Sequence, residues 1–100
     1  MPEMTVVYWR DIPAQVICGS GRRAAKVQLS ERFEQAIDRA AMRSGADATD
    51  AYLAEWHKVP AGAVEGDAAA AAAAKAAALE ADWPRERLAA VAMAGGQEAV

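Results

Sequence analysis

A glycine loop with arginines near the middle of the N-terminal half is the sequence feature with the clearest capacity for chemistry. It reads GSGRR over residues 19–23, and Lys26 follows. Glycines let backbone N–H groups converge on an anion, and arginines offer bidentate contacts to phosphate or carboxylate. The spacing matches neither GxxxxGK[ST] nor GxGxxG, whose last glycine would fall at Ala24. Three interpretations stay open: an anion site, a protein-docking loop and a solvated connection.

Cys18 and His57 are the only cysteine and the only histidine, and each could be reactive. The nearby arginines could lower the pKa of Cys18, although a lone cysteine in an apolar strand is usually a small buried hydrophobe. His57 could work with Glu55, two residues away, but an exposed edge histidine is the simpler expectation. We therefore predict no catalytic residue, no metal site and no cofactor, since these residues form no recognised ligand spacing.

Charge and cysteine content exclude several classes of protein. Residues 1–43 hold seven Lys/Arg against five Asp/Glu, while residues 44–100 hold four against nine. Nucleic-acid-binding domains usually concentrate a larger positive excess, so we expect no nucleic-acid partner. One cysteine allows no internal disulfide, which is typical of a reducing compartment. With no segment typical of export or of a membrane span, the sequence predicts a cytoplasmic protein without a membrane partner.

Alternating apolar residues predict three strands that would position these side chains. Residues 4–10 carry β-branched and aromatic side chains on both faces, which is typical of a central strand. Pro13 then interrupts the pattern, and residues 14–19 resume as the second strand of a hairpin. Side chains of residues 51–60 alternate between two faces, with Tyr52 and Trp56 on the same one, and this pattern predicts a third strand. Pro60 would end that strand.

Helix signals fill the rest of the chain. Ser30 is a candidate N-cap of an amphipathic helix that should stop before Gly45. The alanine-rich segment 68–82 has the highest helix propensity of the chain, with Asp67 as its cap. Pro84 favours a new helix over residues 85–94, ended by the glycine pair that follows. We expect residues 97–100 to fray.

The predicted element order is therefore ββαβαα, a small α+β fold with a three-stranded, mainly antiparallel sheet and Ala-rich helices packed on it. Residues 1–96 would form one domain, because a chain of 100 residues fits a single modest core. If the third strand returns beside the first, the first strand becomes central. The two sheet edges and any uncovered aromatic residue would then be places where a partner, or a second copy, could dock.

The sequence also resembles a family of small bacterial domains known as virulence factor. The segments that carry the resemblance are YWRDIPAQV, GRRAAKVQLSERFEQAIDRAAM and DAYLAEWHK, within roughly residues 5–60. The resemblance supplies no catalytic residues. It implies an accessory role beside a larger enzyme, with folate or corrinoid one-carbon metabolism as the setting.

Together these observations predict a non-catalytic accessory or interaction subunit that docks on a larger cytoplasmic metabolic enzyme. The alternative is a small protein that binds an anion such as phosphate or a folate-like ligand through the glycine loop. Aromatic and arginine side chains dominate binding hot spots, and both lie in the first strand and the loop after the hairpin. The predicted partner- or anion-binding residues are Tyr8, Trp9, Arg10, Gly19, Gly21, Arg22, Arg23 and Lys26.

Overall fold

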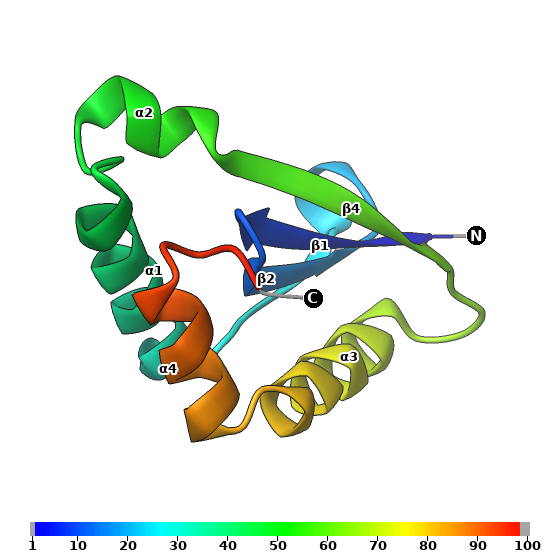
Figure 1. Ribbon diagram of the computed structural model, residues 1–100. Helices are drawn as coiled ribbons and strands as arrows, with labels where there is room; N and C mark the ends of the chain where they lie inside the picture. The colour runs from blue at the N-terminus through cyan, green and yellow to red at the C-terminus, as the bar shows by residue number, and fades with distance from the viewer. Residues whose placement is uncertain (1, 99–100) are drawn as a thin grey trace.

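A four-stranded antiparallel sheet forms the centre of the fold, with the strand order β3-β2-β1-β4 (Figure 1). The computed structural model describes residues 2–98. Its strands are β1 (Glu3–Trp9), β2 (Ile12–Cys18), β3 (Ala25–Gln28) and β4 (Trp56–Ala63). β1 lies between β2 and β4, which confirms the central position predicted from its two apolar faces.

The described residues form four α-helices beside the sheet, and all but one lie where the sequence predicted a helix. They are α1 (Glu31–Ser44), α2 (Thr49–Ala54), α3 (Ala68–Asp82) and α4 (Arg85–Met93). In Figure 1, α3 runs beneath the sheet, whereas α1 and α4 lie together at one end of it. A single 3₁₀ turn, η1 (Gly21–Arg23), joins β2 to β3.

The prediction of three strands is wrong, and so is the strand predicted before Trp56. Residues 25–28 form the short edge strand β3, where the sequence analysis expected only a basic connection. Residues 49–54 are the helix α2, although Tyr52 and Trp56 suggested alternation. β4 also continues through Pro60, because an edge strand tolerates a missing N–H.

Two bulges adjust the sheet around β1. Val7 pairs with Gln15 while Tyr8 pairs with Pro13, so the residue between them in β2, Ala14, has no partner in β1. A second irregularity lies in the pairing with β4, between Met4 and the next residue. An extra residue on one strand locally increases twist.

Helix ends follow their predicted caps with one exception. Gly45 adopts φ 76° after α1, and the Asp67 carboxylate accepts from Ala70 N at 3.3 Å. Ser30 precedes α1 but makes no side-chain cap, because its N–H and its hydroxyl both donate to Glu80, at 2.8 and 2.9 Å. The Glu80 carboxylate of α3 therefore binds the residue that precedes α1, and the expected serine cap does not form.

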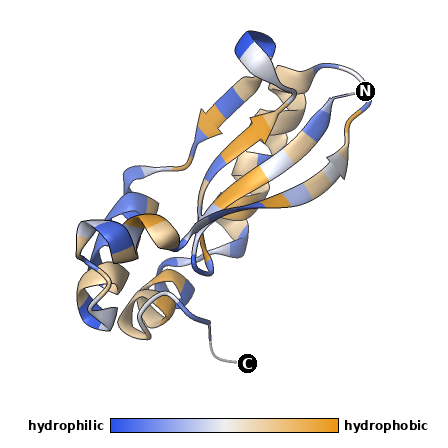
Figure 2. Cartoon of the chain, turned by 90° about the horizontal axis from the view of Figure 1, so that it is seen from above, coloured by the Kyte–Doolittle hydropathy of each residue, from blue (hydrophilic) through white to orange (hydrophobic). Residues whose placement is uncertain are grey.

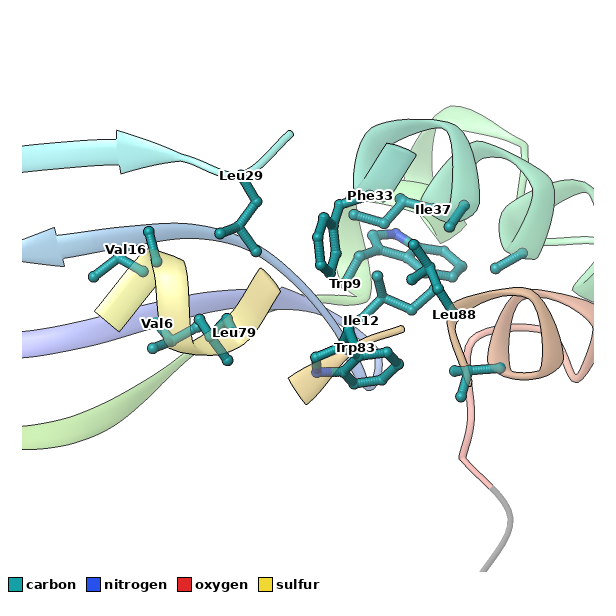
Figure 3. Close-up of a cluster of buried hydrophobic side chains, with 14 of the residues drawn as sticks. Val6, Trp9, Ile12, Val16, Leu29, Phe33, Ile37, Leu79, Trp83 and Leu88 are labelled. Atoms are coloured by element: carbon teal, nitrogen blue, oxygen red, sulfur yellow. The ribbon is translucent and has the colours of Figure 1, made fainter. Parts of the chain in front are cut away.

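One hydrophobic cluster joins the sheet to the helices (Figure 3). Trp9 lies at its centre, fully buried, and its indole Nε1 donates to Tyr52 O at 2.9 Å. Figure 3 shows Trp9 beside Phe33 and Ile37 of α1, with Leu79 of α3 further along the sheet. Alanines fill many helix positions that face the core, which lets helix and sheet backbones approach closely.

Candidate functional site

The eight predicted binding residues fall into two groups at opposite ends of the β1–β2 hairpin. Residues 8–10 lie at the end of β1 beside the turn that joins it to β2. Gly19 and the residues after it lie beyond the other end, where Gly19 N donates to Glu3 O at 2.9 Å. The length of β1 separates the groups, so the predicted residues do not form one site.

Trp9 and Arg10 are held inside the fold. Trp9 has no exposed surface. Arg10 adopts φ 53°, its Nη1 donates to Gly95 O at 2.9 Å, and its guanidinium lies 5.2 Å from the Trp9 ring centroid. Its Nε lies 3.4 Å from Glu55 Oε2 without forming a hydrogen bond. Arg10 therefore ties the hairpin turn to the end of α4 and to the start of β4.

One face of the sheet carries no helix along most of its length, and we call it the open face. Figure 2 looks down on the strands with α3 behind them. Strand pairing and alternation place these residues on it: Thr5, Val7, Gln15, Ile17, Lys26, Gln28 and Lys58. Lys26, Gln28 and Lys58 are exposed, whereas the others are half-buried. The open face is thus apolar at its centre, with amine and amide groups around it.

The glycine loop borders a hollow of about 380 Å³ at one end of the open face. Gly19, Ser20 and Gly21 line one side of it, and Lys26 and Lys58 converge on it from the two edge strands. Gly19 and Gly21 have φ 100° and 67°, a conformation that favours glycine. Arg22 and Arg23 are exposed on η1 and do not line the hollow.

A second depression of about 480 Å³ lies on the other face of the sheet, and we call it the β4–α3 cleft. Its lining residues are Tyr8, Arg10, Asp11, His57, Val59, Lys75, Leu79, Asp82, Trp83, Arg87 and Glu98. The Tyr8 and His57 rings stack with centroids 5.8 Å apart. Burial raises the pKa of the Tyr8 hydroxyl, and the nearby Arg87 charge opposes part of that rise. This cleft gathers more hydrogen-bonding groups than the hollow.

The lone cysteine and histidine follow their simplest interpretations. Cys18 is fully buried in the core, as expected of a small hydrophobe. His57 is exposed on the edge strand, and its Nδ1 lies 3.3 Å from Glu55 O, while the Glu55 carboxylate lies beside Arg10. Within residues 2–98, no group of three His, Cys, Asp or Glu side chains could hold a metal ion. None of the helices described there has the length and apolar character to cross a membrane.

Sequence reasoning identified Lys26 and Arg10 but missed the other cations of the two depressions, Lys58, Lys75 and Arg87. Lys58 belongs to the hollow because strand pairing sets it opposite Val7. Lys75 and Arg87 belong to the cleft because α3 and α4 bring them beside the edge of the sheet. The predicted strand over residues 51–60 contains Lys58, so alternation alone would have placed it on one face with Trp56. No local pattern indicates the pairing of Arg87 with the distant Glu98.

Comparisons with known proteins place the chain in a family. Neither the curated proteins nor the solved structures that were searched contain a match. A family model described as "Virulence factor" matches residues 7–92. The matched segment begins within β1 and ends one residue before the end of α4, so it includes part of β1, most of α4 and every strand and helix between them. Because the match extends over most of the sequence, the chain belongs to the virulence factor family.

Proposed function

We propose that this protein is a non-catalytic accessory subunit whose open face docks on an acidic surface of a larger protein. The observation that carries the proposal is a sheet face that no described helix covers, with Val7 and Ile17 at its centre and two lysines around them. An apolar centre with a polar rim is the usual composition of a docking surface.

Charge supports an acidic partner even though the whole chain has a net charge of −3. Lys26 and Lys58 lie on the open face, and Arg22 and Arg23 are exposed on the adjoining η1 turn. Alternation places one carboxylate, Glu3, at the border of the same face. The acidic residues that set the net charge are concentrated in the second half of the sequence. An acidic partner would be attracted to this face more than to the helical side.

The family resemblance makes an enzyme of folate or corrinoid one-carbon metabolism the first partner to test. The experiment captures the tagged protein from its own cells, identifies a stoichiometric partner and then measures its binding with both proteins purified. Lys26→Glu/Lys58→Glu should weaken the affinity roughly tenfold or more, because both new carboxylates would face like charges. Wild-type binding should also weaken as ionic strength rises.

Lys75→Glu is the control, since it reverses the charge of one lysine on the α3 side of the sheet, where the double variant reverses two on the open face. It should leave the affinity for the partner unchanged. Equal binding by the wild type and the double variant would overturn the proposal, and so would an equal loss in Lys75→Glu. Self-association lost in the double variant would identify a second copy of the chain as the occupant of the open face instead.

Anion binding at the hollow is the second candidate function. The observation that favours it is the convergence of Lys26 and Lys58 beside the backbone of Gly19 and Gly21. Ammonium groups and glycine N–H groups are the donors that oxyanions use. Arg10, Arg22 and Arg23 do not line the hollow. Their positions argue against a larger anion site in which all the predicted arginines would hold one ligand.

Titration with inorganic phosphate at low ionic strength separates the two candidates. A saturable change in the NMR signals of residues 19–24 that Lys26→Glu/Lys58→Glu removes would support an anion site. Sodium chloride at matched ionic strength is the control. Phosphate and chloride producing equal, non-saturating changes would contradict the anion site and leave the docking role as the only candidate.

A further inference from the structure

The β4–α3 cleft contains an arginine that is already arranged to receive a carboxylate. The Arg87 guanidinium carbon lies 3.9 Å from the Trp83 ring centroid, and its Nη1 donates to Asp82 O at 2.7 Å. Stacking on the ring and the bond to the carbonyl fix the plane of the guanidinium. Its remaining edge, Nε and Nη2, is therefore directed at whatever anion occupies the cleft.

The chain itself shows which chemistry fits that edge. Both oxygens of Glu98 accept from Arg87, Oε2 from Nε at 2.6 Å and Oε1 from Nη2 at 2.9 Å. This is the paired geometry in which arginine recognises carboxylates. The hydrogen bond with Arg87 lowers the pKa of Glu98, so the carboxylate is ionised over the physiological range. Residues 97–100 were predicted to fray, and of these residues 99–100 lie outside the described part of the chain. Glu98, however, is held, since its N also donates to Asp11 Oδ2 at 2.7 Å.

We propose that the β4–α3 cleft binds a small planar organic carboxylate, whose carboxylate group takes the place of Glu98 on Arg87. The site lies on the opposite face of the sheet from the open face, so this function is additional to docking. Tyr8 and His57 would contact the planar part, and Lys75 offers a further ammonium group from α3.

The balance of charge in the cleft favours such an exchange. Arg10 already pairs with Glu55 at 3.4 Å, so Arg87 is the cation of the lining whose charge Glu98 balances. When Glu98 swings away, the Arg87 guanidinium loses the carboxylate with which it forms an ion pair among the described residues. A monocarboxylate ligand restores the balance, whereas a neutral ligand of the same shape leaves one uncompensated cation.

The present occupant is also accessible to solvent, which a displaceable group requires. The side chains of Arg87 and Glu98 are each 37% exposed, so water and dissolved anions compete for this ion pair. A ligand that reaches Arg87 gains the same ion pair and in addition contacts Val59, Leu79 and Trp83, which give the cleft an apolar part. Glu98 gains none of these apolar contacts through its carboxylate.

Benzoate is the probe for this site, and benzamide is its neutral control of the same shape. Titrations followed by ¹H–¹⁵N NMR would record the Arg87 Nε–H and Trp83 indole N–H signals. Benzoate should shift both signals in a saturable way, and benzamide should not. Glu98→Gln should tighten benzoate binding roughly fivefold, because the competing carboxylate is removed.

Glu86→Gln makes the same chemical change one helix position from Arg87 and outside the cleft lining, and it should leave the affinity unchanged. Arg87→Gln should abolish the response to benzoate. Equal shifts with benzamide would overturn the proposal. An unchanged affinity in Glu98→Gln, or equal tightening in Glu86→Gln, would overturn it as well. The benzoate titration of Glu98→Gln tests the proposal even if Arg87→Gln disturbs the fold.

Discussion

Gly96 is the residue whose replacement the structure resists most directly. A Cβ built on it would lie 2.9 Å from Trp9 Cζ3 and 3.4 Å from Ala40 Cβ, and its φ is 90°. Gly66 has nearly the same φ, 91°, with no atom within 4 Å of a built Cβ. Replacing each of these two glycines by alanine therefore separates the free-energy cost of the backbone conformation from the cost of crowding.

Gly96→Ala should lower the free energy of unfolding more than Gly66→Ala does. Backbone strain in the left-handed region costs both variants roughly 1–2 kcal/mol. Crowding against Trp9 should cost Gly96→Ala about 1–3 kcal/mol more. Urea unfolding followed by tryptophan fluorescence measures both. Equal losses in the two variants would show that Trp9 moves aside freely, contrary to its fully buried position.

Residue-level prediction from the sequence succeeded where a residue acts on its immediate neighbours in the chain. Asp67 caps α3 and Gly45 ends α1 as expected, since both roles depend on the next turn of backbone alone. Ser30 failed as a cap because Glu80, fifty positions away, supplies a carboxylate to it. Trp9 was predicted at a partner surface, but Gly96 lies close to its ring and Tyr52 O accepts from its indole, both from distant parts of the sequence.

The junction between α1 and α3 depends on the ionised form of Glu80. Burial favours protonation of this carboxyl, but hydrogen bonds from Ser30 and Arg32 outweigh it and hold its pKa below the ordinary value. Arg32 Nη2 donates to Glu80 Oε1 at 3.0 Å, and Arg32 Nη1 reaches Trp83 O at 2.6 Å. The end of α3 is thereby fastened to the first turn of α1.

Acid should therefore loosen this junction. Because the pKa of Glu80 is lower in the folded chain, its contribution is present above its unfolded value of about 4.5 and is lost as the pH falls through the folded value. The contribution should be on the order of 1 kcal/mol, as for exposed charged hydrogen bonds. Urea unfolding of wild type and Glu80→Gln at pH 7 and pH 3 measures it. The stability gap between them should shrink at pH 3, and a constant gap would contradict the assignment.

Elements were predictable from the sequence when their pattern was long. The helices α1 and α3 extend over 14 and 15 residues, enough for periodicity and propensity to agree. α2 has only 6 residues, and its alternating Tyr52 and Ala54 gave a false strand signal. β3 has 4 residues, of which Val27 alone is a large hydrophobe, so its pairing with β2 supplies what its own sequence lacks.

At the scale of the whole molecule, sheet and helices share one core. The cluster of buried residues includes Val6 and Val16 from the strands, Phe33 from α1 and Leu79 from α3. No separate satellite cluster accompanies it among the residues that the structure describes. The open face and the β4–α3 cleft lie on opposite sides of the sheet that this core supports, so the two proposed sites can be altered independently.

A shared core should make unfolding a single cooperative transition. Tryptophan fluorescence reports on Trp9 and Trp83, whose rings are buried at the junction of the helices with the sheet. Far-ultraviolet circular dichroism reports mainly on the helices. The two urea transitions should coincide, as expected of a two-state domain. Helical signal lost at lower urea than fluorescence would show instead that the helices unfold apart from the sheet.

The α+β class and the central position of β1 followed from the sequence, whereas the arrangement of the candidate sites did not. The predicted residues were neighbours in the sequence, but the β1–β2 hairpin carries residues 8–10 and the glycine loop to opposite ends of the sheet. Lys58 and Arg87 reached their sites only through the pairing of β4 and the packing of α4. Long-range contacts of this kind leave no local pattern.

The hydrogen bond from Asp11 N to Gly96 O, 2.8 Å long, also constrains the order of events during synthesis. The first hairpin leaves the ribosome long before Gly96 does, and until then the Trp9 side chain lacks part of its cover. Until Gly96 has emerged, a nascent chain would therefore present the Trp9 indole to the solvent, and domains expose their aggregation-prone surface in such an interval.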